Sequence, residues 1–176
     1  MPDYTFAPPT ERDIVQLHAI YSDPEVWRHL PSGRHTELEQ TARMVREWIA
    51  GWRTEGLSHW VVRDAASARV LGHVGCGLRR GCFWNLGYRI APSAQARGIA
   101  TAGACKAIDA AHHTDPEMPV VAYLLEHNAS SAHVARKVGL ELQSRCPDAG
   151  NPDPQAVRLI FADRPLTAEV LSAAQK

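Results

Sequence analysis

The sequence lacks an excess of charge of either sign. Its 176 residues include 19 Lys and Arg and 19 Asp and Glu, so the formal net charge is zero. This balance gives no reason to expect a basic surface that binds nucleic acid. A small local anion site stays possible, because such a site needs only a few groups. We therefore expect no nucleic-acid partner.

Cysteine is scarce, and patterns for metal binding, export and membrane insertion are missing. The four cysteines form no C-x-x-C pair and the nine histidines include no H-E-x-x-H, so we expect no metal. No apolar run approaches the roughly 20 residues that a membrane span needs. The first ten residues have neither the basic nor the apolar region of a secretory signal. These absences predict a cytoplasmic protein without a membrane partner.

The sequence does contain the composition and length of one ordinary globular domain. Hydrophobic residues make up 45% and charged residues 22% of the chain. Three consecutive strand patterns, followed by strands that alternate with helices, predict a mixed α/β fold. We expect strands over 4–8, 59–64, 70–78, 83–90, 120–125, 140–146 and 156–162, helices over 10–21, 37–53, 98–113 and 130–138, and a frayed helical tail over 163–176 of the single domain 1–176.

The segment from Asn85 to Thr101 carries the first sign of chemistry. A strand pattern ends at Ile90, a loop crosses Pro92, and a helix opens near Gly98. The N-terminus of a helix has backbone N–H groups without intrahelical partners and a partial positive charge, so it can bind an oxyanion or a pyrophosphate without metal. On this segment alone an ordinary β-to-α turn is the simpler interpretation.

A second segment favours the anion-binding interpretation, because it resembles a known family. Asn128-x-x-Ser131 followed by Lys137-x-Gly139 resembles the N-x-x-S…K-x-G segment of the GNAT acetyltransferase superfamily, which binds acetyl-coenzyme A. Gln95-x-x-Gly98-x-Ala100 is similar to the R/Q-x-x-G-x-G/A pyrophosphate loop of the same superfamily. The stretches 22–31 and 86–92 resemble the "SDPEV…LP" and "IGYWLAP" motifs of its RimJ/RimL-like branch.

The resemblance implies a fold and a set of cofactor contacts. The implied fold is a twisted mixed sheet of six to seven strands that splays between the fourth and fifth, with helices on both faces. Acetyl-CoA is the implied acyl donor, held between the splayed strands, without metal. The implied contacts are the backbone of Tyr88, Arg89 and Ile90 to the pantetheine arm, the N–H groups of Gln95, Ala96, Arg97, Gly98, Ile99, Ala100 and Thr101 to the pyrophosphate, Asn128 to the pantetheine arm, and Lys137 to the nucleotide end.

The catalytic residues depart from the family pattern. A Tyr acid usually lies seven residues after the Asn, but this position is Ala135; Ser131 is the nearest hydroxyl that can protonate the departing sulfur, and it is equally well a helix-backbone contact. A Glu is common just before the "IGY" stretch, but Asn85 stands here and cannot accept a proton. Glu126, His73 and His127 are substitutes, each with a structural alternative, and a water chain is also allowed. We assign Glu126 as the base.

The resemblance predicts an N-acetyltransferase that acts by direct attack of an amine in a ternary complex. An α-amine of pKa about 8 is about a fifth neutral near pH 7.4, whereas a lysine amine is about a thousandth neutral. A site with a weak base therefore favours a peptide N-terminus or a small amine of low pKa. Trp27, Trp84 and Asn85 are the expected acceptor contacts, and the protein is a monomer or homodimer. The alternative is a catalytically impaired sensor or interaction domain that binds coenzyme A.

Overall fold

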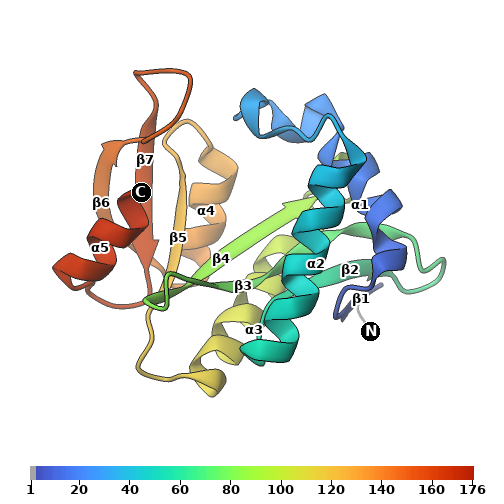
Figure 1. Cartoon of the computed structure of the whole chain (residues 1–176), viewed down its shortest axis with the longest axis horizontal. Coiled ribbons are helices and arrows are strands. Elements are labelled where there is room, and N and C mark those ends of the chain that lie inside the picture. The colour runs from blue at the N-terminus through green and yellow to red at the C-terminus, as the bar shows by residue number, and fades with distance from the viewer. Residues whose placement is uncertain (1–2) are drawn as a thin grey trace.

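A seven-stranded mixed sheet organises the chain, and the computed structural model describes residues 3–176 of it (Figure 1). The strands lie in the order β1-β2-β3-β4-β5-β7-β6. They are β1 (Tyr4–Ala7), β2 (His59–Asp64), β3 (Val70–Arg79), β4 (Phe83–Ile90), β5 (Val120–Leu125), β6 (Glu141–Pro147) and β7 (Val157–Ala162). The helices are α1 (Ile14–Tyr21), α2 (Leu38–Thr54), α3 (Ile99–Thr114), α4 (Ala129–Lys137) and α5 (Ala168–Gln175).

The predicted mixed α/β class and the splayed sheet are confirmed. The limits of β2, β4 and β5 coincide with the predicted strands, and the other elements differ by one to four residues at their ends. Local signals explain the starts of helices. The carboxylate of Asp13 accepts hydrogen bonds from the backbone N–H and the hydroxyl of Thr10 at 2.8 and 3.1 Å, which fixes the turn that leads into α1.

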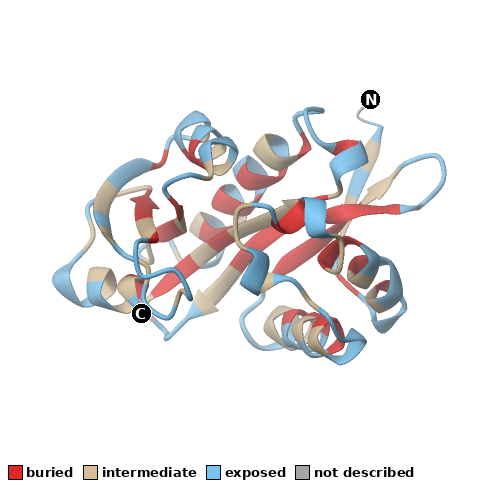
Figure 2. Cartoon of the chain, turned by 90° about the horizontal axis from the view of Figure 1, so that it is seen from above, coloured by how far each residue is buried: buried red, intermediate tan, exposed pale blue. Residues whose placement is uncertain are grey.

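The helices cover the two faces of the sheet unequally (Figure 2). Helices α3 and α4 pack on one face, over a core that includes Trp60, Trp84 and Phe161. Helices α1 and α2 pack on the opposite face over β2 and β3, and α5 packs on β7. Between α2 and α5 this second face is left open above β4, and the candidate site lies there.

Strands β4 and β5 part soon after they meet. Their parallel pairing joins only Trp84 to Val120 and Asn85 to Val121. Beyond that point β5 pairs along its length with β7, while β4 continues to pair with β3, and Figure 1 shows β4 running diagonally away from the more upright β5. The second half of β4 therefore has one edge without a strand partner.

The direction of the free N–H groups on this edge follows from their neighbours. The N–H of Ala91 donates to the carbonyl of Leu71, next to β3, whereas the N–H of Trp84 donates to Pro119 on the β5 side. Because N–H groups alternate in direction along a strand, the N–H groups of Tyr88 and Ile90 point toward the gap.

The C-terminal residues differ from the frayed tail that we predicted. Helix α5 is capped by Thr167, whose hydroxyl accepts from the N–H of Val170, and Ala174 is buried against β7 and β4. The guanidinium of Arg158 donates to the carbonyl of Ala174 at 2.9 Å. Apolar packing and this bond fix the segment on β7. Over residues 3–176, no helix has the length and hydropathy of a membrane span.

Candidate active site

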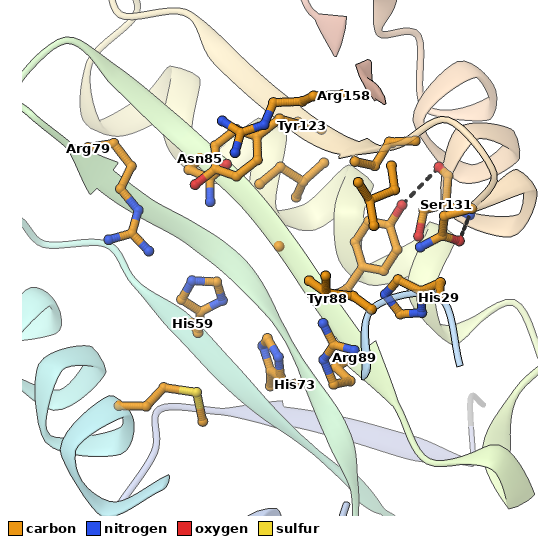
Figure 3. Close-up of a pocket in the computed structure, with 18 of the residues that line it drawn as sticks. His29, His59, His73, Arg79, Asn85, Tyr88, Arg89, Tyr123, Ser131 and Arg158 are labelled. Carbon is orange, nitrogen blue, oxygen red and sulfur yellow. Dashed lines mark hydrogen bonds between the residues drawn. The ribbon is translucent and has the colours of Figure 1, made fainter. Parts of the chain in front are cut away.

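A cavity of about 410 Å³ opens where β4 and β5 separate (Figure 3). One wall comes from α1, α2 and the segment between them, and includes Tyr21, His29 and Trp48. The opposite wall comes from β5 and from the start of β7 with the loop before it. The floor is the sheet itself, and at its far end the cavity reaches the N-terminus of α4. It thus passes from the open face of the sheet through the strand gap.

Polar side chains line the floor because the alternation of two strands brings them to one face. Asn85 pairs with Gly77, Gly87 with Gly75, and Arg89 with His73 in the β3–β4 ladder, and paired residues project from the same side. His59 of β2 lies opposite Gly75. A Cβ on Gly87 would come within 3.2 Å of the His59 ring, so the glycines make room for this imidazole.

His59 and His73 are buried without charge. The Nε2 atom of His73 lies 2.7 Å from the Tyr21 hydroxyl, while Nδ1 of each ring has no hydrogen-bond partner within residues 3–176. Burial lowers the pKa of His59 to about 3, and burial, followed by the electrostatic effects of the neighbouring His59 and Arg89, lowers the pKa of His73 well below 6.5. Both rings pack on Trp48, at 4.8 and 4.5 Å between centroids. They are neutral imidazoles near pH 7.

Arg89 is a partly buried cation at the same place. Its guanidinium lies 3.6 Å from the centre of the Trp27 ring, and Nη1 donates to the carbonyl of Val26 at 3.3 Å. Its Nε atom is buried and has no partner among the described residues. Burial lowers the pKa of Arg89, and the nearby Tyr21 hydroxyl opposes that effect.

Two carboxylates also line the cavity, and neither lies free in its interior. Asp148 pairs with Arg158, whose guanidinium in turn lies 4.9 Å from the centre of the Tyr123 ring. Glu47 is exposed on α2 at the rim. On the floor, Oδ1 of Asn85 is buried and has no hydrogen-bond partner in the described chain, so it offers an acceptor to a bound molecule.

The far end of the cavity is built by the start of α4. The carboxamide oxygen of Asn128 caps the helix by accepting from the N–H of Ser131 at 3.2 Å and from the hydroxyl of Ser130 at 3.0 Å. The phenol of Tyr88 donates to the carbonyl of Ser131 at 3.1 Å, and burial raises the pKa of Tyr88 to about 12. This bond ties β4 to α4 across the gap.

A second polar feature lies at the start of α3, just after β4. Gly98 is the N-cap with φ +75° and has no side-chain cap, and a Cβ built on it would touch nothing within 4 Å. Ala96 is also left-handed at φ +60°. The side chain of Ile99 is buried in the core and anchors the first turn. The first N–H groups of α3 therefore face open space, as an anion site requires.

The structure brings some predicted residues to the cavity and places others elsewhere. Asn85, Tyr88, Arg89, Asn128 and Ser131 line it. Trp84 does not: it is buried beneath α3 on the opposite face, because adjacent strand residues point to opposite sides. Trp27 lies behind Arg89 and donates its indole N–H to the carbonyl of Tyr21.

Several predicted polar groups are held by other contacts. Glu126 is exposed outside the cavity and accepts two hydrogen bonds from Arg145, which lower its pKa and weaken it as a base. Arg97 pairs with Asp3, and the carboxamide of Gln95 donates to the carbonyl of Ile90 at 3.0 Å. Lys137 is exposed in the last turn of α4.

Two features of the site escaped the sequence reasoning. His59 received no role, and Arg89 was predicted to act only through its backbone. The available signal was polarity within otherwise apolar or glycine-rich strands: His59, His73 and Arg89 occupy positions where a strand buried on both faces normally carries Val or Ile.

A family model and solved structures both relate the chain to acetyltransferases. A family model described as an acetyltransferase (GNAT) domain matches residues 4–141. No curated protein matches the sequence significantly. Similar solved structures include a GNAT-family acetyltransferase from Bacillus anthracis (18% identity, TM-score 0.72, 92% of this chain and 94% of that chain).

Two further structures carry more specific descriptions. One is a ribosomal-protein-S5-alanine acetyltransferase from Vibrio fischeri (15% identity, TM-score 0.75, 92% of this chain and 93% of that chain). The other is RimL, a ribosomal α-N-protein acetyltransferase in complex with coenzyme A (16% identity, TM-score 0.74, 92% of this chain and 94% of that chain). At these identities the likeness concerns the fold.

Proposed function

Since the chain belongs to the acetyltransferase (GNAT) domain family, we propose that it is an acetyl-CoA-dependent N-acetyltransferase of the RimJ/RimL-like branch. Its acceptor is a primary amine of low pKa, either a peptide N-terminus or a small amine. The "IGY"-like and "SDPEV"-like motifs and the ribosomal-protein acetyltransferases among similar structures support the branch.

The observation that carries the proposal is the unpaired edge of β4. It lies between the open first turn of α3 and a polar cavity on the other face, so one molecule can approach from each side. The residues fit coenzyme A: Gly98 is left-handed, has free space where a Cβ would stand, and precedes N–H groups that lack intrahelical partners.

We assign the binding groups as follows. The backbone of Tyr88, Arg89 and Ile90 pairs with the pantetheine arm as an added strand does, and the N–H groups of residues 95–101 hold the pyrophosphate. Asn128 is close enough to the gap to contact the same arm while it caps α4. Lys137 is assigned to the nucleotide end of the cofactor.

Acetyl-CoA, when bound, would supply a thioester as the acyl donor, so that transfer would form a bond between the carbonyl carbon and the acceptor nitrogen and break the bond from that carbon to sulfur. The N–H of Ile90, which points into the gap, donates to the carbonyl oxygen on which negative charge grows. Ser131 lies at the α4 end of the cavity and would give its proton to the departing sulfur, which takes the bonding electron pair. The proton that the amine loses would then return through solvent water to the serine, so that no net proton is gained or lost.

The amine loses its proton to His73 in this scheme. The tautomer with Nε2–H donating to Tyr21 leaves the unpartnered Nδ1 with a lone pair. Because burial lowers its pKa, the imidazole stays neutral but is a weak base. A weak base suffices only for an amine that is already largely neutral, which supports an acceptor of low pKa.

The proposal is tested by thiol release from acetyl-CoA in the presence of a pooled amine library, with a thermal-shift measurement of cofactor binding alongside. We expect a shift with acetyl-CoA alone and thiol release that depends on peptides or amines of pKa near 8. Cofactor binding with no release for any amine would contradict an acetyltransferase and favour a coenzyme A sensor. Absence of binding would contradict both.

A further inference from the structure

Arg89 is a positive charge without a negative partner in the part of the chain that the structure describes. The titratable groups near it are neutral rings: Tyr21 on α1, His73 on β3 with His59 of β2 behind it, and His29 and His35 on the segment before α2. The exposed Arg79 also lines the cavity, at the other end of the β3–β4 ladder. Burial lowers the pKa of His29, His35 and His73, and the charge of Arg89 lowers each of them further. The carboxylates of the cavity are Glu47 at the exposed rim and Asp148, which pairs with Arg158. Within residues 3–176, Arg89 forms no ion pair at 4 Å or less.

Burying a guanidinium in this way costs free energy unless something compensates it. The Trp27 ring and the Val26 carbonyl fix its plane but supply no charge. The Nε–H group stays buried without an acceptor among the described residues, and an unmet buried donor is itself unfavourable. An anionic ligand bound in the cavity would offset this unfavourable free energy, because it would supply the negative charge and the hydrogen-bond acceptor that Arg89 lacks.

The geometry points to a carboxylate on the acceptor, close to the amine that is acetylated, as the partner of Arg89. This inference rests on the proposed function. Arg89 directly follows Tyr88 on the strand whose edge meets the acyl donor, so a group that it holds lies next to the reacting centre. A guanidinium offers two parallel N–H donors to a carboxylate, which fixes both position and orientation.

A carboxylate fits better than a phosphate because Arg89 is the one positive charge at its end of the cavity; the exposed Arg79, which also lines the cavity, lies opposite Phe83 at the other end of the β3–β4 ladder. The three histidines whose pKa the charge of Arg89 depresses are neutral near pH 7. Arg158 is already neutralised by Asp148. Beside Arg89 a dianionic phosphate would carry one negative charge more than the guanidinium balances, whereas a carboxylate matches it.

Matched peptides test this directly. The peptides Asp-Ala-Ala-amide and Asn-Ala-Ala-amide have nearly the same shape and differ in one carboxylate. We expect kcat/KM for the first to exceed that for the second by about 30-fold, in keeping with a charge-assisted bidentate contact. The same comparison with Glu and Gln peptides, and with free aspartate against its α-amide, distinguishes a side-chain carboxylate from an α-carboxylate.

The variant Arg89→Gln should bring the Asp-to-Asn ratio to about 1, chiefly through a higher KM for the carboxylate peptide. Arg79→Gln is the matched control, since Arg79 lines the same cavity (Figure 3); it should affect both peptides alike and keep the ratio. A ratio near 1 in the wild type, or an equal loss for both peptides in Arg89→Gln, would overturn the inference.

Measurements of thermal stability and of acetyl-CoA binding distinguish a failure of this inference from a folding defect and from a failure of the proposed function. Arg89→Met removes an uncompensated charge and should raise Tm by a few degrees, with acetyl-CoA binding retained; a lower Tm would mean that Arg89 serves packing. If acetyl transfer occurs but ignores the carboxylate, the inference fails and the proposed function stands. If no amine is acetylated but titration calorimetry shows N-acetyl-aspartate binding that Arg89→Gln abolishes, the proposed function fails and the anion site stands.

Discussion

At the residue scale, the cavity concentrates groups that a buried strand normally excludes. Unpartnered polar atoms on His59, His73, Asn85 and Arg89 all belong to its floor. Each such atom lowers the stability of the fold. Their concentration along three neighbouring strands on one face, next to the unpaired edge of β4, supports the proposal that the acceptor binds on this face.

Ser131→Ala should separate proton donation from cofactor contact. Loss of the hydroxyl should lower kcat about 10- to 100-fold while leaving the affinity for acetyl-CoA nearly unchanged, because the N-cap bond of Asn128 uses the backbone of Ser131. The measurement is steady-state kinetics together with calorimetric binding. Ser130→Ala, one position away on the same turn, is the control. Equal losses in kcat and in cofactor affinity would reduce Ser131 to a binding contact.

His73→Gln should lower kcat/KM about 100-fold, since it removes the group that takes the amine proton. The wild-type pH profile should follow the pKa of the acceptor amine, with no break near 6.5, because the pKa of His73 lies well below that value. An acceptor of lower pKa should partly rescue the variant. If Glu47→Gln causes the larger loss, the rim carboxylate is the base and the assignment to His73 is wrong.

At the scale of elements, the sequence predicted the limits of strands and helices where nearby residues determine them. The limits of β4 follow from an alternating apolar pattern ended by Pro92, and the first turn of α3 from Gly98. The position of β7 between β5 and β6 depends on pairing between segments that are distant in the sequence. No local sequence pattern indicates such pairing. Trp84 was assigned to the acceptor site together with Asn85, although neighbours on one strand cannot share a face. Which of the two faced the site depended on where α2 and α3 pack.

Gly98→Glu tests the start of α3 as the cofactor site. The substitution places a carboxylate in front of the N–H groups that would hold phosphate oxygens, so we expect acetyl-CoA affinity to fall at least 100-fold. Gly81→Glu is a close control, because Gly81 also has positive φ, at +65°, and a Cβ added to it would likewise meet no atom within 4 Å. Both variants should lose similar stability from backbone strain. If both keep full affinity, the pyrophosphate lies elsewhere.

At the scale of the whole molecule, the net charge is zero, so anions must be bound by local groups rather than by a general positive potential. Helix-end N–H groups carry no formal charge, and Arg89 is a single cation beside the neutral rings of Tyr21 and Trp27. The anionic cofactor and the proposed carboxylate acceptor are thus each bound by a few oriented donors, while the remaining surface exerts little net attraction on polyanions.

The neutral buried histidines should also make the stability of the whole protein depend on pH. The folded state depresses the pKa of His59 and His73 below their unfolded value near 6.5, so below that pH the unfolded chain binds more protons and stability falls. Between pH 7.0 and 5.5 the free energy of unfolding should drop by about 1 kcal/mol for each of the two. Carboxylates such as Asp163, whose pKa is lowered, do not titrate between pH 7.0 and 5.5, so they do not contribute to this drop. Urea unfolding at both pH values measures the drop, and His59→Asn should make it smaller by about 1 kcal/mol. A stability that is flat or rises as the pH falls would mean that these imidazoles are protonated in the fold, and the neutral acceptor cavity would then be wrong.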